Sequence, residues 1–217
     1  MEVEYIDDLP LLSNQIEQFD IRSLIETHFP DHGHWKGLSG GQVLFVWLLY
    51  ILSESDHRLS YVEDWANTRL KTIATLLCVS KVRGIDFSDD RLGNLLDRLS
   101  DDEKWSNLEQ SISKRLLKVY DLSEEQQEDT PKIIRTDSFN VPQYRQVSEL
   151  FTHGYSKQRR SDQPFSKVML SSLDPLAVPL AVDLLKGSGP DVDHYIPLIE
   201  RAQSMFENTG NLYVGDS

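Results

Sequence analysis

The chain has 217 residues, of which 39% are hydrophobic and 26% charged, a balance that excludes a wholly disordered protein. Its formal net charge of −13 disfavours a general nucleic-acid-binding protein, which usually presents a basic surface. The single cysteine, Cys78, excludes an internal disulfide, so we expect a cytoplasmic protein that folds without one.

The sequence does not predict a membrane protein. The first eight residues are acidic where a secretory signal peptide would be basic. The longest apolar run, residues 43–52, is well short of the roughly 20 residues that a membrane helix needs. We therefore expect this run to lie in a buried core helix.

The first 120 residues predict a helical domain. A rough apolar stripe over residues 11–21 indicates a helix that ends before Pro30. Ser39 can cap a second helix that runs to about Glu54, and this helix is apolar nearly all round, which predicts a central position. Three further helices are expected over residues 61–78, from Ser88, and from Asp101 or Asp102.

The remainder of the chain predicts strands. The acidic, polar residues 121–130 are interpreted as a linker, and residues 131–217 as a second domain. A short strand is expected over residues 133–136, ending near Asp137, and residues 144–155 carry a weaker strand pattern. A hairpin is expected from strands at residues 167–173 and 178–185. A helix over residues 193–206 and a last strand from residue 212 follow. With Pro179 in it, the second strand of the hairpin is expected at a sheet edge or a bulge. The predicted order is β, β, β, α, β, and the fold class is α+β.

Asp137 and Asp216 occupy similar local settings, because each follows a short β-rich run and precedes a serine. Side chains alternate along a strand, so Asp137 shares a face with Arg135, and Asp216 shares one with Val214. If the two strands are parallel neighbours, both carboxylates can meet at one sheet edge and bind Mg²⁺ or Mn²⁺. The alternative is that each is an ordinary turn or capping aspartate.

The residues around these aspartates resemble the DDE transposases of bacterial insertion sequences, closest to the insertion-sequence-four-like group. The resemblance rests on Asp137-Ser138, on Gly154-Tyr155-Ser156-Lys157, on the hairpin of residues 167–185, and on Tyr213-Val214-Gly215-Asp216. Residues 31–39, Trp47, residues 50–57 and residues 89–93 resemble the helical domain that precedes the catalytic domain in one branch of these proteins.

This resemblance implies a ribonuclease H-like second domain in which Asp137 and Asp216 are the first and second catalytic, metal-binding acids. It implies DNA transposition by metal-dependent strand cleavage and transfer, with transposon ends and target DNA as partners and a homo-oligomer as the active form. The family's third acid, a Glu on a later helix, has no position before the chain stops at Ser217. The sequence therefore predicts an incomplete domain that is inactive alone, in a truncated or split transposase or in a fragment that covers the first half of one.

A local basic patch survives in this acidic chain. Its cations are close together around residues 157–167, with only Asp162 among them, and an aromatic residue stands beside them. The candidate DNA-binding residues are Tyr155, Lys157, Arg159, Arg160 and Lys167. Such cations can lie against phosphates and position DNA without reading its sequence. The alternative is a solvated loop.

Two other functions stay open. The chain can be a catalytically inactive DNA-binding or interaction protein, such as a transposase remnant or competitor. It can also be a helical scaffold with an unrelated α/β tail. The histidines at positions 28, 32, 34 and 57 could suggest zinc, but a polar turn is the simpler interpretation.

Overall fold

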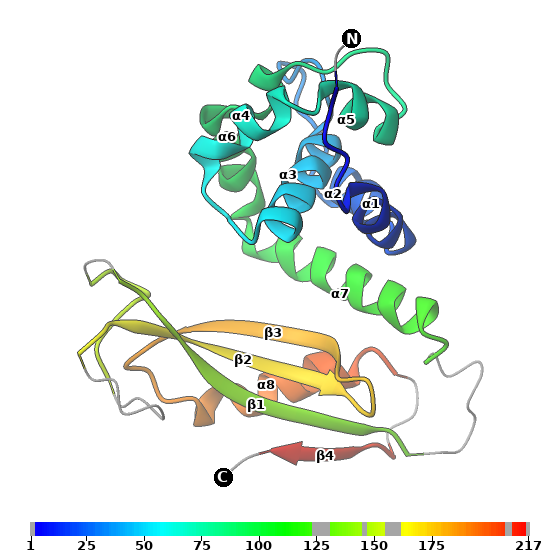
Figure 1. Ribbon diagram of the computed structural model, residues 1–217. Helices are drawn as coiled ribbons and strands as arrows, with labels where there is room; N and C mark the ends of the chain where they lie inside the picture. Colours follow the sequence, from blue (N-terminus) through cyan, green and yellow to red (C-terminus); the bar gives the residue numbers. More distant parts are fainter. Residues whose placement is uncertain (1–2, 123–130, 145–146, 155–161, 207–209, 216–217) are drawn as a thin grey trace. The chain divides into compact units, whose positions relative to one another are not determined.

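The computed structural model describes residues 3–122, 131–144, 147–154, 162–206 and 210–215 (Figure 1). The chain divides into two compact units, Met1–Arg115 and Leu116–Ser217, which we call the helical unit and the sheet unit. Each unit has a hydrophobic core of its own. Helices in the first unit and a mixed sheet in the second confirm the α+β class. Most of the expected linker, residues 123–130, lies outside the described residues.

The described part of the first unit consists mainly of helices. They are α1 (Leu9–Gln18), α2 (Ile21–His28), α3 (Gly40–Glu54), α4 (Val62–Asn67), α5 (Leu70–Leu76), α6 (Asp89–Leu99) and α7 (Asp102–Val119), with 3-10 turns η1 (Leu59–Tyr61) and η2 (Gly84–Phe87). The division between the units falls within α7. None of the helices in the described ranges is long and apolar enough to cross a membrane.

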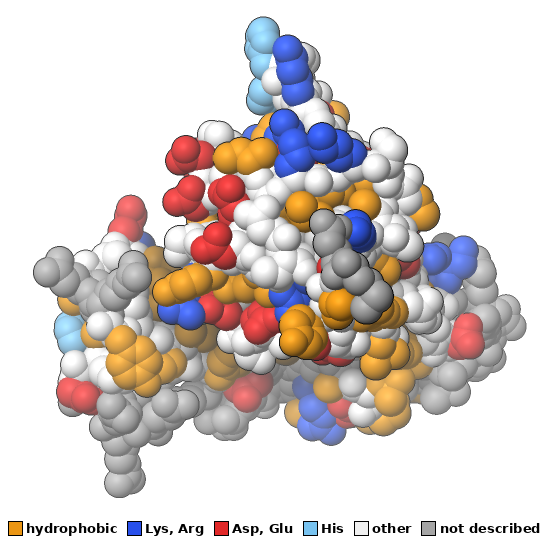
Figure 2. Space-filling model, turned by 45° about the horizontal axis from the view of Figure 1, so that its top comes forward, with side chains coloured by type: hydrophobic (Ala, Val, Ile, Leu, Met, Phe, Trp, Pro, Cys, Tyr) orange, Lys and Arg blue, Asp and Glu red, His pale blue; other side chains and the backbone are white. Residues whose placement is uncertain are grey.

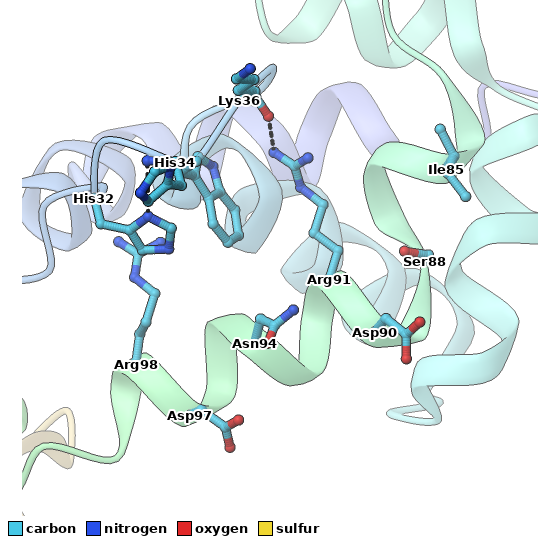
Figure 3. Close-up of a pocket in the computed structure, with 11 residues that line it drawn as sticks. His32, His34, Lys36, Ile85, Ser88, Asp90, Arg91, Asn94, Asp97 and Arg98 are labelled. Atoms are coloured by element: carbon cyan, nitrogen blue, oxygen red, sulfur yellow. Dashed lines mark hydrogen bonds between the residues drawn. The ribbon is translucent and has the colours of Figure 1, made fainter.

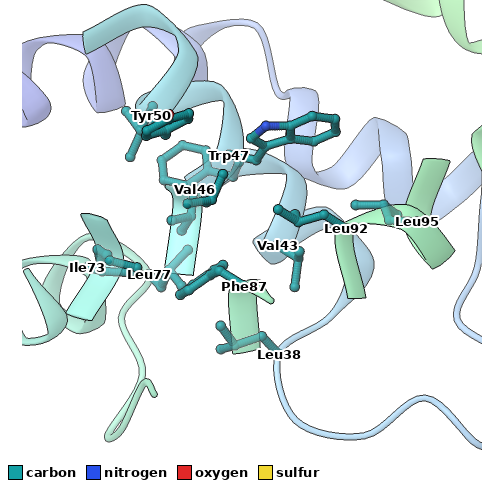
Figure 4. Packing of buried hydrophobic residues seen from close by; sticks show 14 of the residues in the cluster. Leu38, Val43, Val46, Trp47, Tyr50, Ile73, Leu77, Phe87, Leu92 and Leu95 are labelled. Carbon is teal, nitrogen blue, oxygen red and sulfur yellow. The ribbon is translucent and has the colours of Figure 1, made fainter. Parts of the chain in front are cut away.

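Helix α3 is the centre of the helical unit, as its composition predicts. The Ser39 hydroxyl accepts a hydrogen bond from the Gln42 amide, and the Gln42 side chain accepts one from the Ser39 amide, so a complete capping box starts the helix. Figure 4 shows the α3 side chains Val43, Val46 and Trp47 packed among apolar residues of the surrounding helices. The core of this unit is therefore built around one helix.

Two of the expected helices are each broken into shorter pieces. The stripe of residues 11–21 covers most of α1 and reaches the first residue of α2, and the two helices are separated at Asp20, which takes a left-handed conformation with φ of 55°. The expected helix of residues 61–78 is η1, α4 and α5, with a break at Thr68 and Arg69. The helical spacing of apolar residues continues across both breaks, so the sequence pattern does not show where one helix ends and the next begins.

The sheet unit is built on four strands in the order β3-β2-β1-β4. They are β1 (Ile133–Pro142), β2 (Phe165–Leu173), β3 (Val178–Lys186) and β4 (Leu212–Gly215). The first three form an antiparallel meander, and β4 returns after helix α8 (Val192–Gln203) to pair with β1 in parallel (Figure 1). The expected order of strands and helix is confirmed. Strand β3 lies at an edge, and its register with β2 shifts near Pro179, as expected.

Strand β1 corrects one expectation. It does not end near Asp137 but continues to Pro142, because residues 138–142 pair with residues 165–169 of β2. Phe139 and Val141, which favour extended backbone, lie in this second half. In the described part of residues 144–155, only an isolated bridge from Thr152 to Phe165 forms.

One face of the sheet packs against α8. Leu198 and Ala202 of α8 are fully buried in a cluster with Ile134 of β1 and Met169 of β2. Leu117, from the last turn of α7, belongs to the same cluster. The sheet therefore has a core face, towards α8, and an opposite face that carries the odd-numbered residues of β1 from 133 to 141.

Candidate catalytic and DNA-contact site

The alternation of side chains along β1 determines where Asp137 points. Ile134, Thr136 and Ser138 are buried on the core face, with Thr136 2% and Ser138 5% exposed. Arg135 and Asp137 are exposed on the opposite face. The prediction that these two share one face is confirmed, and the Asp137 carboxylate lies away from the hydrophobic core.

The parallel pairing of β1 with β4 brings the two candidate strands together. Arg135 pairs with Val214, and Thr136 pairs with Gly215. The condition on which the carboxylate pair depends, that these strands are parallel neighbours, is met. Asp216 itself lies outside the described residues, so its meeting with Asp137 stays a prediction.

Backbone and side-chain contacts organise the surroundings of Asp137. The Ser138 amide donates to Asp137 Oδ1 at 2.7 Å, which holds one carboxylate oxygen against its own strand. Arg135, on the same face, donates from Nε to Asp174 Oδ2 at 2.7 Å. An exposed carboxylate on a strand next to β4 is a suitable hard ligand for a divalent cation.

A polar cluster on the core face of β1 escaped the sequence analysis. The Ser138 hydroxyl donates to Asp191 Oδ2 at 2.8 Å, and Lys167 Nζ lies 3.6 Å from Asp191 Oδ1. Lys167 Nζ also donates to the Gly189 carbonyl at 2.7 Å. Burial acts to raise the pKa of Asp191, but the Ser138 hydrogen bond and the Lys167 charge outweigh it and hold the pKa below its ordinary value.

Lys167 is therefore more buried than a residue that contacts DNA at the protein surface would be. Its side chain is only 14% exposed, and its ammonium is engaged with Gly189 and Asp191. The signal was present in the sequence, because Lys167 stands in the same alternation as Met169, which packs in the core. A DNA contact by Lys167 stays a prediction.

The other four candidate DNA-binding residues, Tyr155, Lys157, Arg159 and Arg160, lie outside the described residues. The segment just before them is fixed to the sheet. Thr152 pairs with Phe165 through two backbone hydrogen bonds of 3.1 Å, and the Gly187 amide donates to the Leu150 carbonyl at 3.3 Å. Gly187 permits this approach, since a Cβ there would lie 2.0 Å from the Phe165 carbonyl oxygen.

Within the described residues, no group of three or more His, Cys, Asp or Glu side chains could hold a metal ion, and Asp216 is not among those residues. The zinc alternative gains no support, because His28 Nε2 lies 2.9 Å from the Ser111 hydroxyl and is used in that hydrogen bond. The candidate metal ligands stay Asp137 and Asp216.

Comparison with known proteins identifies the first half of the chain. A family model described as a domain of unknown function, DUF4277, matches residues 1–113, which include every helix from α1 to α6 and most of α7. No curated protein and no solved structure matches the chain. Because the matched residues make up just over half of its length, the chain belongs to the DUF4277 family.

Proposed function

We propose that this chain is the N-terminal part of a DDE transposase, with a helical domain that binds transposon-end DNA and a ribonuclease H-like domain that begins with β1. The observation that carries the proposal is the parallel pairing of β1 with β4. It joins β1, which carries Asp137, to β4, which directly precedes Asp216, and these two aspartates match the acids of the transposase resemblance.

The proposed chemistry is cleavage and transfer of DNA strands. Asp137 and Asp216 would hold the metal, with Asp137 fixed on its strand by the Ser138 amide. Mg²⁺ or Mn²⁺ bound there would activate a water or a 3′-hydroxyl and stabilise the leaving oxygen of the phosphodiester. The third ligand would come from the acidic residue that the family carries beyond the second Asp.

Substrate DNA would be held by cations near the segment that Thr152 fixes to the sheet. Tyr155, Lys157, Arg159 and Arg160 follow that segment directly in the sequence. Lys167 would stabilise β2 through its contact with Asp191. Phosphate contacts of this kind position DNA, and in the active homo-oligomer they would align transposon ends with target DNA.

A strand-transfer assay tests the proposal in a form of the protein that carries the third acid. We expect Asp137→Asn to abolish Mg²⁺-dependent strand transfer while end binding stays largely intact, because the amide is a poor metal ligand but nearly the same size. Asp193→Asn is the matched control, since Asp193 is an exposed residue of α8.

Strand transfer at the wild-type rate by Asp137→Asn would refute the assignment. End binding by the unmodified protein with no metal-dependent transfer would instead favour the second candidate, a DNA-binding protein without catalytic activity.

A further inference from the structure

A pocket with a volume of about 650 Å³ lies in the helical unit, between the loop of residues 31–38 and helix α6. Figure 3 shows His32, His34 and Lys36 of the loop on one side and Arg91 and Arg98 of α6 on the other. Neither the transposase resemblance nor the family match assigns it a ligand.

The charge of this pocket differs from that of its surroundings. Residues 1–113 contain 20 acidic and 10 basic residues. The pocket inverts this excess, because three cations line it, Lys36, Arg91 and Arg98, against two carboxylates, Asp90 and Asp97. Figure 2 shows Lys, Arg and His side chains gathered at the top of the view, above a group of acidic ones. The pocket is therefore a local site for negative charge on an acidic domain.

Arg91 differs from the other arginines of residues 1–113 in its partners. Each of the other arginines of residues 1–113 has a carboxylate within 4 Å; these are Arg22, Arg58, Arg69, Arg83 and Arg98. In the described part of the chain Arg91 has no such partner, and its guanidinium donates only to the carbonyls of Lys36 and Leu38, both at 2.8 Å. Burial lowers the pKa of Arg91 from its ordinary value. A partly desolvated charge without a carboxylate partner favours an incoming anion.

The pocket is organised before any ligand arrives. The Arg91 and Arg98 guanidinium carbons lie 4.5 Å and 4.9 Å from the centre of the Trp35 ring. The Trp35 indole N–H donates to the Leu38 carbonyl at 2.7 Å, and Arg98 bonds both Asp31 and the Phe29 carbonyl. Loop and helix are thus joined through one indole, which lowers the conformational cost of binding.

We propose that this pocket binds a phosphodiester group of a nucleic-acid backbone, and so forms the DNA contact of the helical domain. Because Arg98 is already paired with Asp31, the cations that remain for an incoming anion are Arg91 and Lys36. A backbone phosphate carries one negative charge and a free phosphate group nearly two at neutral pH, so the diester is repelled less by Asp90 and Asp97, which also line the pocket. The exposed Lys36 ammonium and Asn94 amide supply donors at the rim. The inference rests on the DNA-binding part of the proposed function and not on its catalytic part.

The first test removes one cation. Binding of the full chain to a fluorescein-labelled DNA duplex is measured at several salt concentrations, for the unmodified protein, Lys36→Gln and Lys81→Gln. Lys81 is an exposed lysine that does not line the pocket, so it is the matched control. We expect Lys36→Gln to weaken binding and to reduce the slope of log K against log salt by about 0.9, the value for one lost phosphate contact. Lys81→Gln keeps the original slope.

The second test adds a cation, so that loss of folding cannot imitate the result. We expect Asn94→Lys to strengthen duplex binding and steepen the salt slope, while Asn107→Lys, the same change at an exposed position of α7 outside the pocket, does neither. Equal behaviour of each variant and its control overturns the proposal. The proposal is also overturned if Lys36→Gln weakens the binding of inorganic phosphate but leaves duplex binding unchanged. Neither test needs strand transfer, so catalytic failure of Asp137 variants leaves the result standing.

Discussion

The acidic residues at the start of the chain act as intramolecular tethers. The Glu4 carboxylate accepts hydrogen bonds from the Lys71 and Thr72 amides at 2.9 and 2.8 Å, and from the Thr72 hydroxyl at 2.8 Å. Asp7 pairs with Arg69 at 3.0 Å. The excess negative charge of this segment therefore has a structural role, because it fixes the first residues to the start of α5.

Replacing Glu4 tests this role. Glu4→Gln is expected to lower the free energy of unfolding by about 1 kcal/mol at pH 7, since a carboxylate that caps helix amides contributes about that much. Burial acts to raise the pKa of Glu4, but its hydrogen bonds to Lys71 and Thr72 lower it below the ordinary value of 4.5. A lowered folded-state pKa means that the stabilisation is present above the unfolded-state pKa. It is lost as the pH falls through the folded-state value.

Urea unfolding at pH 7 and at pH 3 measures the effect. The difference between the unmodified protein and Glu4→Gln is expected to shrink at the lower pH. Ser106→Ala, at an exposed position of α7 that does not titrate, is the control that keeps its small effect at both values. A Glu4→Gln difference that is the same at both pH values would contradict the tether.

At the residue scale, the sequence predicted the face on which Asp137 lies but not its position within the strand. Alternation is a local property, so Arg135 and Asp137 could be placed on one face from the sequence alone. The length of β1 depends on pairing with β2, which joins Phe139 to Val168 across 29 positions. That pairing is non-local, and it was not visible in the short run before Asp137.

Among the elements, α3 provides the clearest test of a local signal. Ser39→Ala removes the hydroxyl that accepts from the Gln42 amide at 3.1 Å, and we expect a loss of about 1 kcal/mol in unfolding free energy. Ser88→Ala is the matched control, because Ser88 precedes α6 but makes no side-chain capping hydrogen bond there. Thermal unfolding of both variants measures the difference. Equal losses would show that the capping box contributes nothing particular.

The elements that the sequence did not predict are those that depend on distant partners. Helix α5 begins where Glu4 caps its amides, and Glu4 is 67 positions away from Lys71. The break before α5 is further fixed by Arg69, whose guanidinium donates to the Asp7 carboxylate at 3.0 Å, 62 positions away. Helix α3, in contrast, has its cap and its apolar run within one short segment, and it was predicted correctly.

At the scale of the whole molecule, the two hydrophobic cores respond to substitution separately. Phe45 is fully buried in the helical unit and Met169 in the sheet unit. Phe45→Ala is expected to cost about 3–5 kcal/mol and Met169→Ala about 2–5 kcal/mol, because each leaves a cavity. Hydrogen exchange measured on peptides is expected to rise in the unit that carries the substitution and to stay unchanged in the other. Faster exchange in both units after either substitution would contradict independent cores.

The pairing of β4 with β1 also determines the order in which the molecule assembles. Thr136 and Gly215 meet across 79 positions, whereas the meander of β1, β2 and β3 closes through much shorter loops. Long loops lose more chain entropy on closing, so the last strand joins late, after the meander and α8 offer it an edge. A nascent polypeptide therefore cannot bring these two strands together before β4 has been synthesised, long after β1.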